Sequence, residues 1–192
     1  MTVIRQAFSV DRPGSRYTSP MKTCVLTGGP SVGKTTVVEI LASRGYGIVP
    51  EAARLIAEEE CIKGTGISPA RSIQTFQQYV AERQLKLESE ARGELVFLDR
   101  GIVDGYAYCT FAKVPVPRQI LDAGRGRYDR VFLLDSLGKY VEDGVRSRAT
   151  EDPDRIHELI QEAYRTFGYD LIRVPVLPPE GRVDFIVNLL QF

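Results

Sequence analysis

A glycine-rich segment of the chain has the residue types and spacing needed to hold phosphate groups. Residues 28–35 match the pattern GxxxxGK[ST] in full. Gly28 and Gly33 permit a backbone path that side chains would block, so successive N–H groups can point inward as an anion-binding nest. Lys34 can reach the β- and γ-phosphates, and the Thr35 hydroxyl can bind Mg²⁺. The residues expected to bind a nucleoside triphosphate in this phosphate loop are Gly28, Gly29, Pro30, Ser31, Val32, Gly33, Lys34, Thr35 and Thr36.

The segments on either side of the phosphate loop distinguish it from a chance glycine-rich turn. Residues 23–27 form a short apolar run typical of a buried parallel strand, and residues 34–44 have the pattern of a helix that Gly45 closes. A loop placed between a strand and a helix gains the free amides and the positive dipole end of that helix. The context therefore favours phosphate binding.

Two carboxylates follow expected strands and are candidates for acid–base and metal chemistry. Glu51 comes after a strand expected at residues 46–49, and Asp99 comes after one expected at residues 95–98. Ligands of open α/β sheets bind beyond the carboxyl ends of the strands, so both side chains should face the phosphate loop. Phosphoryl transfer needs a carboxylate near Mg²⁺ and another that orients or deprotonates the acceptor hydroxyl. As an alternative, Glu51 could simply favour the start of the next helix through its dipole.

Three arginines are candidates for neutralising the charge of a moving phosphoryl group. Arg100 directly follows the second carboxylate, whereas Arg146 and Arg148 lie in a charged segment at residues 140–154. A solvated charged loop is the alternative for the latter two.

Strand and helix patterns alternate along the rest of the chain. Further helices are expected at residues 52–60, 69–91, 103–112, 117–123, 154–167 and 181–190, and further strands at 131–134 and 170–174. Pro69 is expected to open the third helix at its first turn. Such alternation implies a parallel sheet with right-handed crossovers and helices on both faces. We therefore expect an α/β fold with three layers, α/β/α, around a five-stranded parallel sheet.

Length and composition set the limits of this interpretation. The 192 residues suit one domain, which we place at residues 21–192, after a leader at residues 1–20 that we expect to be disordered because it lacks periodicity. Lys and Arg number 25, as do Asp and Glu, so no basic excess favours a nucleic-acid polymer as partner.

Cysteine and hydropathy patterns exclude further classes. Cys24, Cys61 and Cys109 are widely spaced, and a single histidine, His157, excludes a Cys/His zinc site. We interpret the cysteines as buried thiols in a reducing cytosol. No apolar run reaches the length of a membrane span and no secretory signal precedes the domain, so we expect a cytoplasmic protein without a membrane partner. The oligomeric state is left open.

The absence of motifs that mark other nucleotide-binding proteins helps to identify the class of this chain. The chain has no Asn-Lys-x-Asp guanine-reading motif of GTPases and no LSGGQ-like signature of transport ATPases. It is short for an AAA+ module with a helical lid domain. Small-molecule kinases are the common class that remains at this size.

With these residues the chain resembles the nucleoside- and nucleotide-kinase branch of P-loop proteins, most closely the ATPase/kinase group typified by bacterial ribosylnicotinamide kinase domains. The resemblance covers most of the chain from Met21 onward and implies a sheet of order 2-3-1-4-5, with ATP and Mg²⁺ as cofactors. The segments that carry it are residues 28–36, Pro50-Glu51-Ala52-Ala53-Arg54, Leu98-Asp99-Arg100-Gly101 and Asp143-Gly144-Val145-Arg146.

The resemblance also implies roles for individual residues. The carboxylate after the second strand acts as a base toward the acceptor in such kinases, which corresponds to Glu51. An Asp-Arg pair after the third strand helps to hold Mg²⁺ and the phosphates, which corresponds to Asp99 and Arg100. A mobile lid delivers arginines, which corresponds to Arg146 and Arg148.

The lid would lie around residues 136–154, although its arginine series is sparser than in nucleoside kinases. Thr75-Phe76-Gln77 is similar to a helix of deoxynucleoside kinases in which the glutamine reads the base, while an exposed helix position is the simpler interpretation of Gln77. Two hypotheses follow. One is an ATP- and Mg²⁺-dependent phosphotransferase for a nucleoside-like or other small hydroxylated acceptor. The other is a nucleotide-binding regulatory ATPase without such an acceptor.

Overall fold

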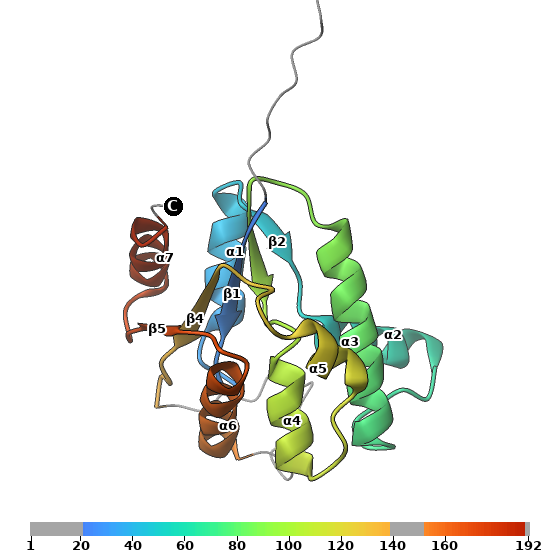
Figure 1. Ribbon diagram of the computed structural model, residues 1–192. Coiled ribbons are helices and arrows are strands. Elements are labelled where there is room, and N and C mark those ends of the chain that lie inside the picture. The colour runs from blue at the N-terminus through green and yellow to red at the C-terminus, as the bar shows by residue number, and fades with distance from the viewer. Residues whose placement is uncertain (1–20, 139–151, 191–192) are drawn as a thin grey trace, which may run out of the picture.

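In the computed structural model, which describes residues 21–138 and 152–190, a parallel sheet lies between two layers of helices (Figure 1). Its five strands have the order β2-β3-β1-β4-β5, as expected. The strands are β1 (Lys22–Thr27), β2 (Gly47–Val49), β3 (Leu95–Asp99), β4 (Arg130–Leu134) and β5 (Leu171–Val174). The helices are α1 (Lys34–Ser43), α2 (Ala52–Lys63), α3 (Ile73–Glu90), α4 (Asp104–Ala112), α5 (Arg118–Ala123), α6 (Pro153–Thr166) and α7 (Pro179–Asn188).

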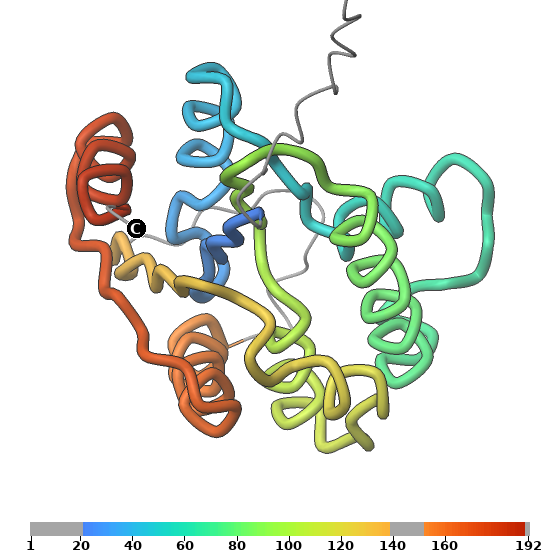
Figure 2. Tube along the Cα trace, turned by 45° about the horizontal axis from the view of Figure 1, so that its top comes forward, coloured from blue at the N-terminus to red at the C-terminus, as the bar shows by residue number. Residues whose placement is uncertain are grey.

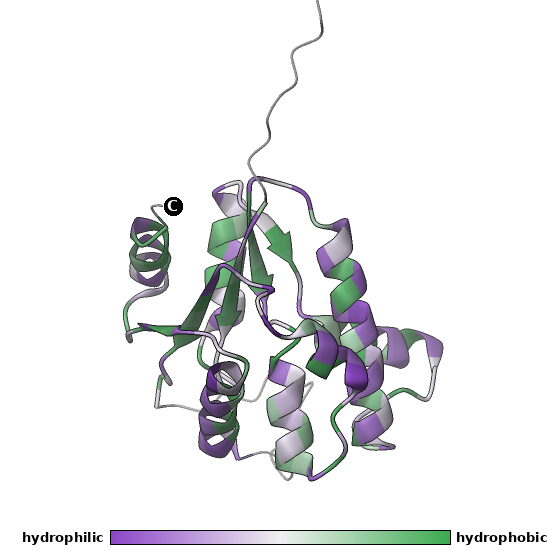
Figure 3. Ribbon diagram, in the orientation of Figure 1, coloured by the Kyte–Doolittle hydropathy of each residue, from purple (hydrophilic) through white to green (hydrophobic). Residues whose placement is uncertain are grey.

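The apolar strand residues alternate between two cores because successive side chains of a strand point to opposite faces. In β1, Val25 packs into the core formed with α3, α4 and α6. Its neighbours Cys24 and Leu26 pack into the opposite core, which α1 and α7 close. The strands are therefore largely apolar on both faces, while most of the polar residues belong to the helices and loops (Figure 3).

The start of α3 differs from the sequence-based expectation. The helix begins at Ile73 rather than at Pro69, because the Ser72 hydroxyl oxygen accepts a hydrogen bond from the Thr75 N–H and caps the helix there. Pro69 instead lies in a turn in which the Arg71 N–H donates to the Ser68 carbonyl. The other expected elements are present, with ends that differ by up to three residues.

The cysteines also differ from the expectation in one respect. Cys24 and Cys109 are buried, and burial raises the pKa of Cys24 to about 12. Cys61, near the end of α2, is exposed. None of the helices among the described residues combines the length and hydrophobicity that a membrane crossing requires.

The helices α2 and α3 lie on the opposite side of the molecule from α7 (Figure 2). Between them, the carboxyl ends of β1, β3 and β4 point to the same edge of the sheet, because these strands are parallel neighbours. That edge holds the candidate site. Arg146, Arg148, the leader expected at residues 1–20 and most of the lid expected at 136–154 lie outside the described residues.

Candidate phosphoryl-transfer site

The phosphate loop connects β1 to α1 and needs glycine at two positions. Gly28 has a φ of 138° and Gly33 a φ of 83°, conformations that side chains disfavour. A Cβ on Gly28 would also lie 2.9 Å from the Leu134 carbonyl oxygen. Because Gly33 directly precedes α1, the free amides of the first helical turn open toward the loop. The backbone is therefore shaped to receive an anion.

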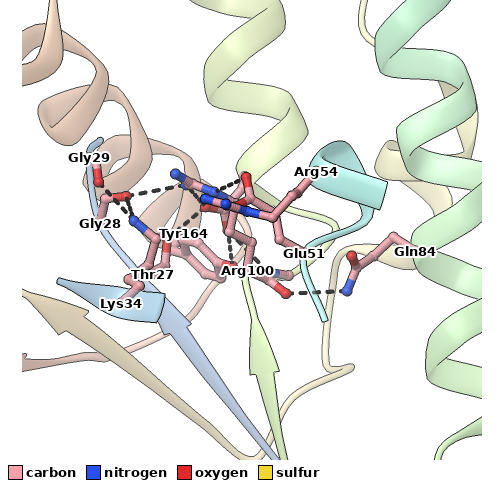
Figure 4. A network of polar contacts seen from close by, with 11 residues as sticks. Thr27, Gly28, Gly29, Lys34, Glu51, Arg54, Gln84, Arg100 and Tyr164 are labelled. Carbon is pink, nitrogen blue, oxygen red and sulfur yellow. Dashed lines mark hydrogen bonds and ion pairs between the residues drawn. The ribbon is translucent and has the colours of Figure 1, made fainter. Parts of the chain in front are cut away.

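Two cationic side chains converge on the carbonyl oxygens of this loop (Figure 4). The Lys34 Nζ donates to the carbonyl oxygens of Gly28, at 3.0 Å, and Gly29, at 2.8 Å. The Arg100 Nη1 donates to the same Gly28 oxygen at 3.2 Å. Positive charge is thus concentrated where a polyphosphate would lie.

Glu51 directs its carboxylate to Arg100 rather than to the start of α2. It occupies the position before the helix, but its side chain makes no capping hydrogen bond. Instead, its Oε1 accepts from the Arg100 Nε at 3.0 Å, and both side chains are buried (Figure 4). The Arg54 Nε lies 4.0 Å from the other carboxylate oxygen. Glu51 thus still lies at the start of α2, but its carboxylate also forms a buried ion pair with Arg100.

The backbone of Arg100 is held in an uncommon conformation. Its φ is 73°, which costs a residue with a side chain of the order of 1 kcal/mol. Its N–H donates to the Leu26 carbonyl at 3.1 Å, and its own carbonyl accepts from the Gln84 Nε2 at 3.2 Å. These bonds keep the guanidinium inside the site, where its Nη2 has no hydrogen-bond partner among the described residues. Buried polar atoms of this kind are rare and often belong to ligand sites.

Asp104, in the first turn of α4, is the hub of the polar network. Its Oδ1 accepts from the Thr27 hydroxyl at 2.7 Å and from the Arg100 Nη1 at 2.8 Å. Its Oδ2 accepts from the Tyr164 hydroxyl at 2.7 Å and from the Gly101 N–H at 3.2 Å. With Asp104 and Glu51 on either side, Arg100 is fixed between two carboxylates.

Asp99 ends β3 beside these groups and has an unsatisfied carboxylate oxygen. The residue is 5% exposed, and its Oδ1 has no hydrogen-bond partner within the described part of the chain. Burial and then the charge of Glu51 raise the pKa of Asp99, while Lys34 opposes this shift. A buried, unpartnered carboxylate oxygen near the phosphate loop is a suitable ligand for a hard cation such as Mg²⁺.

The other residue expected to bind the metal, Thr35, lies exposed in the first turn of α1. The described residues contain no group of three or more His, Cys, Asp or Glu side chains that could hold a metal ion by themselves. Mg²⁺ in kinases usually takes one or two protein oxygens and completes its shell with phosphates and water. The residues present therefore fit Mg²⁺ held together with a nucleotide.

The raised pKa of Asp99 predicts that removing its charge stabilises the protein. A carboxyl whose folded-state pKa lies above its unfolded value costs nothing below the unfolded pKa and destabilises as pH rises through the folded pKa. We expect Asp99→Asn to raise the free energy of unfolding by about 1 kcal/mol at pH 8, and much less at pH 4. Urea unfolding at both pH values measures the difference.

Asp170→Asn, at an exposed position, is the matched control for this substitution. Asp99→Asn should also abolish Mg²⁺-dependent turnover, so stability and activity would change in opposite directions. A lower stability of Asp99→Asn at pH 8 would contradict the assignment of an unsatisfied carboxylate.

A cavity of about 120 Å³ opens beside Glu51 and Arg100, between α2, α3 and α4. Gln77 lines it and is only 4% exposed, so the simpler interpretation of this residue as an exposed helix position is wrong. Other cavity side chains are Ile73, Phe76, Val80, Ile120, Arg54 and Tyr108.

His157 of α6 contacts the phosphate loop from the other side. Its Nδ1 accepts a hydrogen bond from the Gly29 N–H at 3.2 Å. The pKa of His157 lies below its ordinary value of 6.5, mainly because the ring is buried; Lys34 lowers it further, whereas Asp135 opposes the shift. The neutral ring, with a free lone pair on Nδ1, is the form that accepts this bond.

Acid should therefore cancel the contribution of His157 to stability. A histidine whose folded-state pKa is depressed contributes fully above its unfolded pKa and loses that contribution as pH falls through the folded value. We expect the stability advantage of the wild type over His157→Asn to shrink between pH 7.5 and pH 5, as followed by thermal unfolding. A difference that stays constant across this range would contradict the prediction.

The structure brings together Lys34, Glu51, Asp99 and Arg100, all of which the sequence indicated, and adds others that it did not. Asp104 follows the Asp-Arg pair at short spacing, so the string Asp-Arg-Gly-x-x-Asp could have drawn attention to it. His157 contacts the loop across 128 positions of sequence, and no local pattern marks it.

Comparisons with known proteins agree with this geometry. A family model described as an AAA domain matches residues 23–182. A comparison with curated proteins gives no match. Among solved structures, a NadR protein in complex with NAD and AMP-PNP is 18% identical with a TM-score of 0.65, over 88% of this chain and 49% of that one.

A NadR protein in complex with NR is 17% identical, with a TM-score of 0.66 over 90% of this chain and 51% of that one. A deoxyadenosine kinase from M. mycoides with bound dATP is 17% identical, with a TM-score of 0.59 over 89% of this chain and all of that one. The chain thus spans about half the length of the NadR chains. At such identities the similarity establishes the fold.

Proposed function

The chain belongs to this AAA-domain family of phosphate-loop proteins, and we propose that it is an ATP- and Mg²⁺-dependent phosphotransferase for a small, hydroxylated, nucleoside-like acceptor. The fold is that of a nucleotide-binding, kinase-like protein. We propose that residues 21–192 act as one domain.

One observation carries the proposal: the buried ion pair of Glu51 and Arg100 separates the phosphate loop from the cavity. Arg100 contacts the loop through the Gly28 carbonyl, and both Glu51 and Arg100 line the cavity. An acceptor in the cavity and a nucleotide in the loop would meet at this pair. In-line phosphoryl transfer requires the acceptor hydroxyl and the leaving oxygen on opposite sides of the transferred phosphorus, and a carboxylate and a cation at this point can orient the hydroxyl and neutralise charge.

In the proposed mechanism Glu51 holds the acceptor hydroxyl and receives its proton. Lys34 and the free Nη2 of Arg100 bind oxygens of the transferred phosphoryl group. Mg²⁺, held by Thr35 and Asp99, would supply positive charge to the β- and γ-phosphates. Arg146 and Arg148, which lie outside the described residues, are proposed to add charge from a lid.

The cavity supports an acceptor with a ring. An apolar cavity of roughly 150 Å³ can bind benzene, and the cavity beside Glu51 is of similar size, about 120 Å³. Phe76 and Ile120 would contact the faces of a ring, while the Gln77 amide could donate to it and accept from it. These features support a nucleoside-like acceptor, with the base in the cavity and a sugar hydroxyl toward Glu51.

The decisive assay incubates the protein with ATP, Mg²⁺ and a panel of nucleosides, and follows both ADP release and the phosphorylated nucleoside. We expect at least one acceptor to raise ADP release above the rate with water alone. If none does, while ATP still binds, the protein is instead a regulatory ATPase. If one or more nucleosides are accepted, the Gln77→Ala variant should shift the preference among them.

A further inference from the structure

Arg182 of α7 is a buried cation that binds only backbone carbonyl oxygens within the described residues. Its Nη1 donates to the Val32 oxygen at 2.5 Å, its Nη2 to the Asp135 oxygen at 3.1 Å and its Nε to the Pro175 oxygen at 3.1 Å. The residue is 2% exposed. Its three acceptors belong to the phosphate loop and to the segments directly after β4 and β5.

No carboxylate in the described part of the chain forms an ion pair with Arg182, and the charge of Asp135 opposes the effect of burial only in part. The nearby Asp135 side chain is paired with Arg173, at 2.9 and 3.0 Å. Burying a cation without a carboxylate partner is costly, and burial accordingly lowers the pKa of Arg182. Arg182 does not provide the only polar attachment of α7 in the described part of the chain, since Arg44 links α1 to Glu180 and Asp184 of α7.

The contact with Val32 determines where an N–H group of the phosphate loop points. In a trans peptide the carbonyl and the following N–H point in opposite directions, and the described chain has no cis peptide. Because Arg182 holds the Val32 carbonyl, the Gly33 N–H faces away from Arg182. Local sterics alone do not fix this peptide, since Gly33 tolerates conformations of either sign of φ. A contact from outside the loop can therefore help to select its orientation.

We propose that Arg182 is a positioning residue that holds the Val32–Gly33 peptide with its N–H free for a phosphate oxygen. The Gly33 N–H has no acceptor among the described residues, as a phosphate-binding amide requires. Arg182 thereby joins the ends of β4 and β5 to the phosphate loop and preorganises it for the nucleotide. The inference rests on the nucleotide-binding part of the proposed function and does not need the transfer step.

The test measures the affinity for inorganic tripolyphosphate and for ATP by titration calorimetry. Arg182→Met keeps most of the apolar stem but removes the donors. We expect both ligands to bind about tenfold more weakly or worse, as for the loss of one hydrogen bond to a charged group. Arg44→Met is the matched control, because it also removes contacts of α7 but none to the phosphate loop, and its affinities should stay within about twofold of wild type.

A second variant separates orientation from charge. Arg182→Lys keeps the positive charge, but one ammonium group cannot bind three separate carbonyl oxygens in the fork geometry of a guanidinium. We expect it to lose several-fold in tripolyphosphate affinity, and it serves as the test if Arg182→Met does not fold. Spectra of ¹⁵N-glycine-labelled protein should show the Gly33 amide shifting on tripolyphosphate addition in the wild type and shifting less in Arg182→Lys.

The inference is overturned if folded Arg182→Met binds tripolyphosphate within twofold of wild type, or if Arg182→Lys restores the full affinity. Failure of the proposed function is distinguishable, because the kinase assay can find no acceptor while these binding measurements still separate Arg182 from Arg44.

Discussion

Glu51→Gln should lower acceptor-dependent turnover by about 100-fold or more, because it removes the carboxylate that is proposed to receive the acceptor proton. The amide has nearly the same shape and keeps one oxygen, which can still accept from the Arg100 Nε. Binding of ATP at the phosphate loop should therefore change little. Steady-state kinetics with the best acceptor, together with calorimetry of ATP binding, measure the two quantities separately.

Glu58→Gln, on the same helix but exposed, is the control for this substitution, and its turnover should equal that of the wild type. Full activity in Glu51→Gln would contradict general-base catalysis and favour the regulatory ATPase. A loss of ATP binding without loss of turnover at saturation would instead assign Glu51 to the phosphate loop.

Asp104→Ala should be the most destabilising of the substitutions considered, with a loss of about 3–5 kcal/mol in the free energy of unfolding. Four donors lose their acceptor at once, among them the buried Arg100 and the fully buried Tyr164. Leaving such groups unpaired costs more than the bonds contribute. Urea unfolding monitored by circular dichroism gives the free energy.

The matched control is Asp122→Ala, which removes an ion pair between Asp122 and Arg118 within α5, at 3.4 Å. Both side chains of that pair are largely exposed, so we expect a change below about 0.5 kcal/mol. Equal effects of the two substitutions would mean that the Asp104 network does not stabilise the fold. Asp104→Asn keeps one acceptor oxygen and should lie between the two.

The periodicity of the sequence was sufficient for most strands and helices, because these elements depend on local spacing, whereas the strand order was implied by the resemblance to P-loop kinases. Buried parallel strands appear as short apolar runs, and β1, β3 and β4 were found within one residue of their ends. The start of α3 was missed, since Pro69 and Ser72 both permit a helix start and only the capping bond to Thr75 decides between them.

For the site, the sequence by itself determined the phosphate loop and the candidates Glu51, Asp99 and Arg100, because a contiguous motif and strand ends are visible in local order. Only the tertiary structure decided that Arg100 turns to Glu51 and Asp104, that Gln77 is buried in the cavity, and that His157 and Arg182 support the loop. Arg182 and Val32 lie 150 positions apart. Such contacts depend on how helices pack across a sheet, which involves the whole core, and no local spacing encodes them.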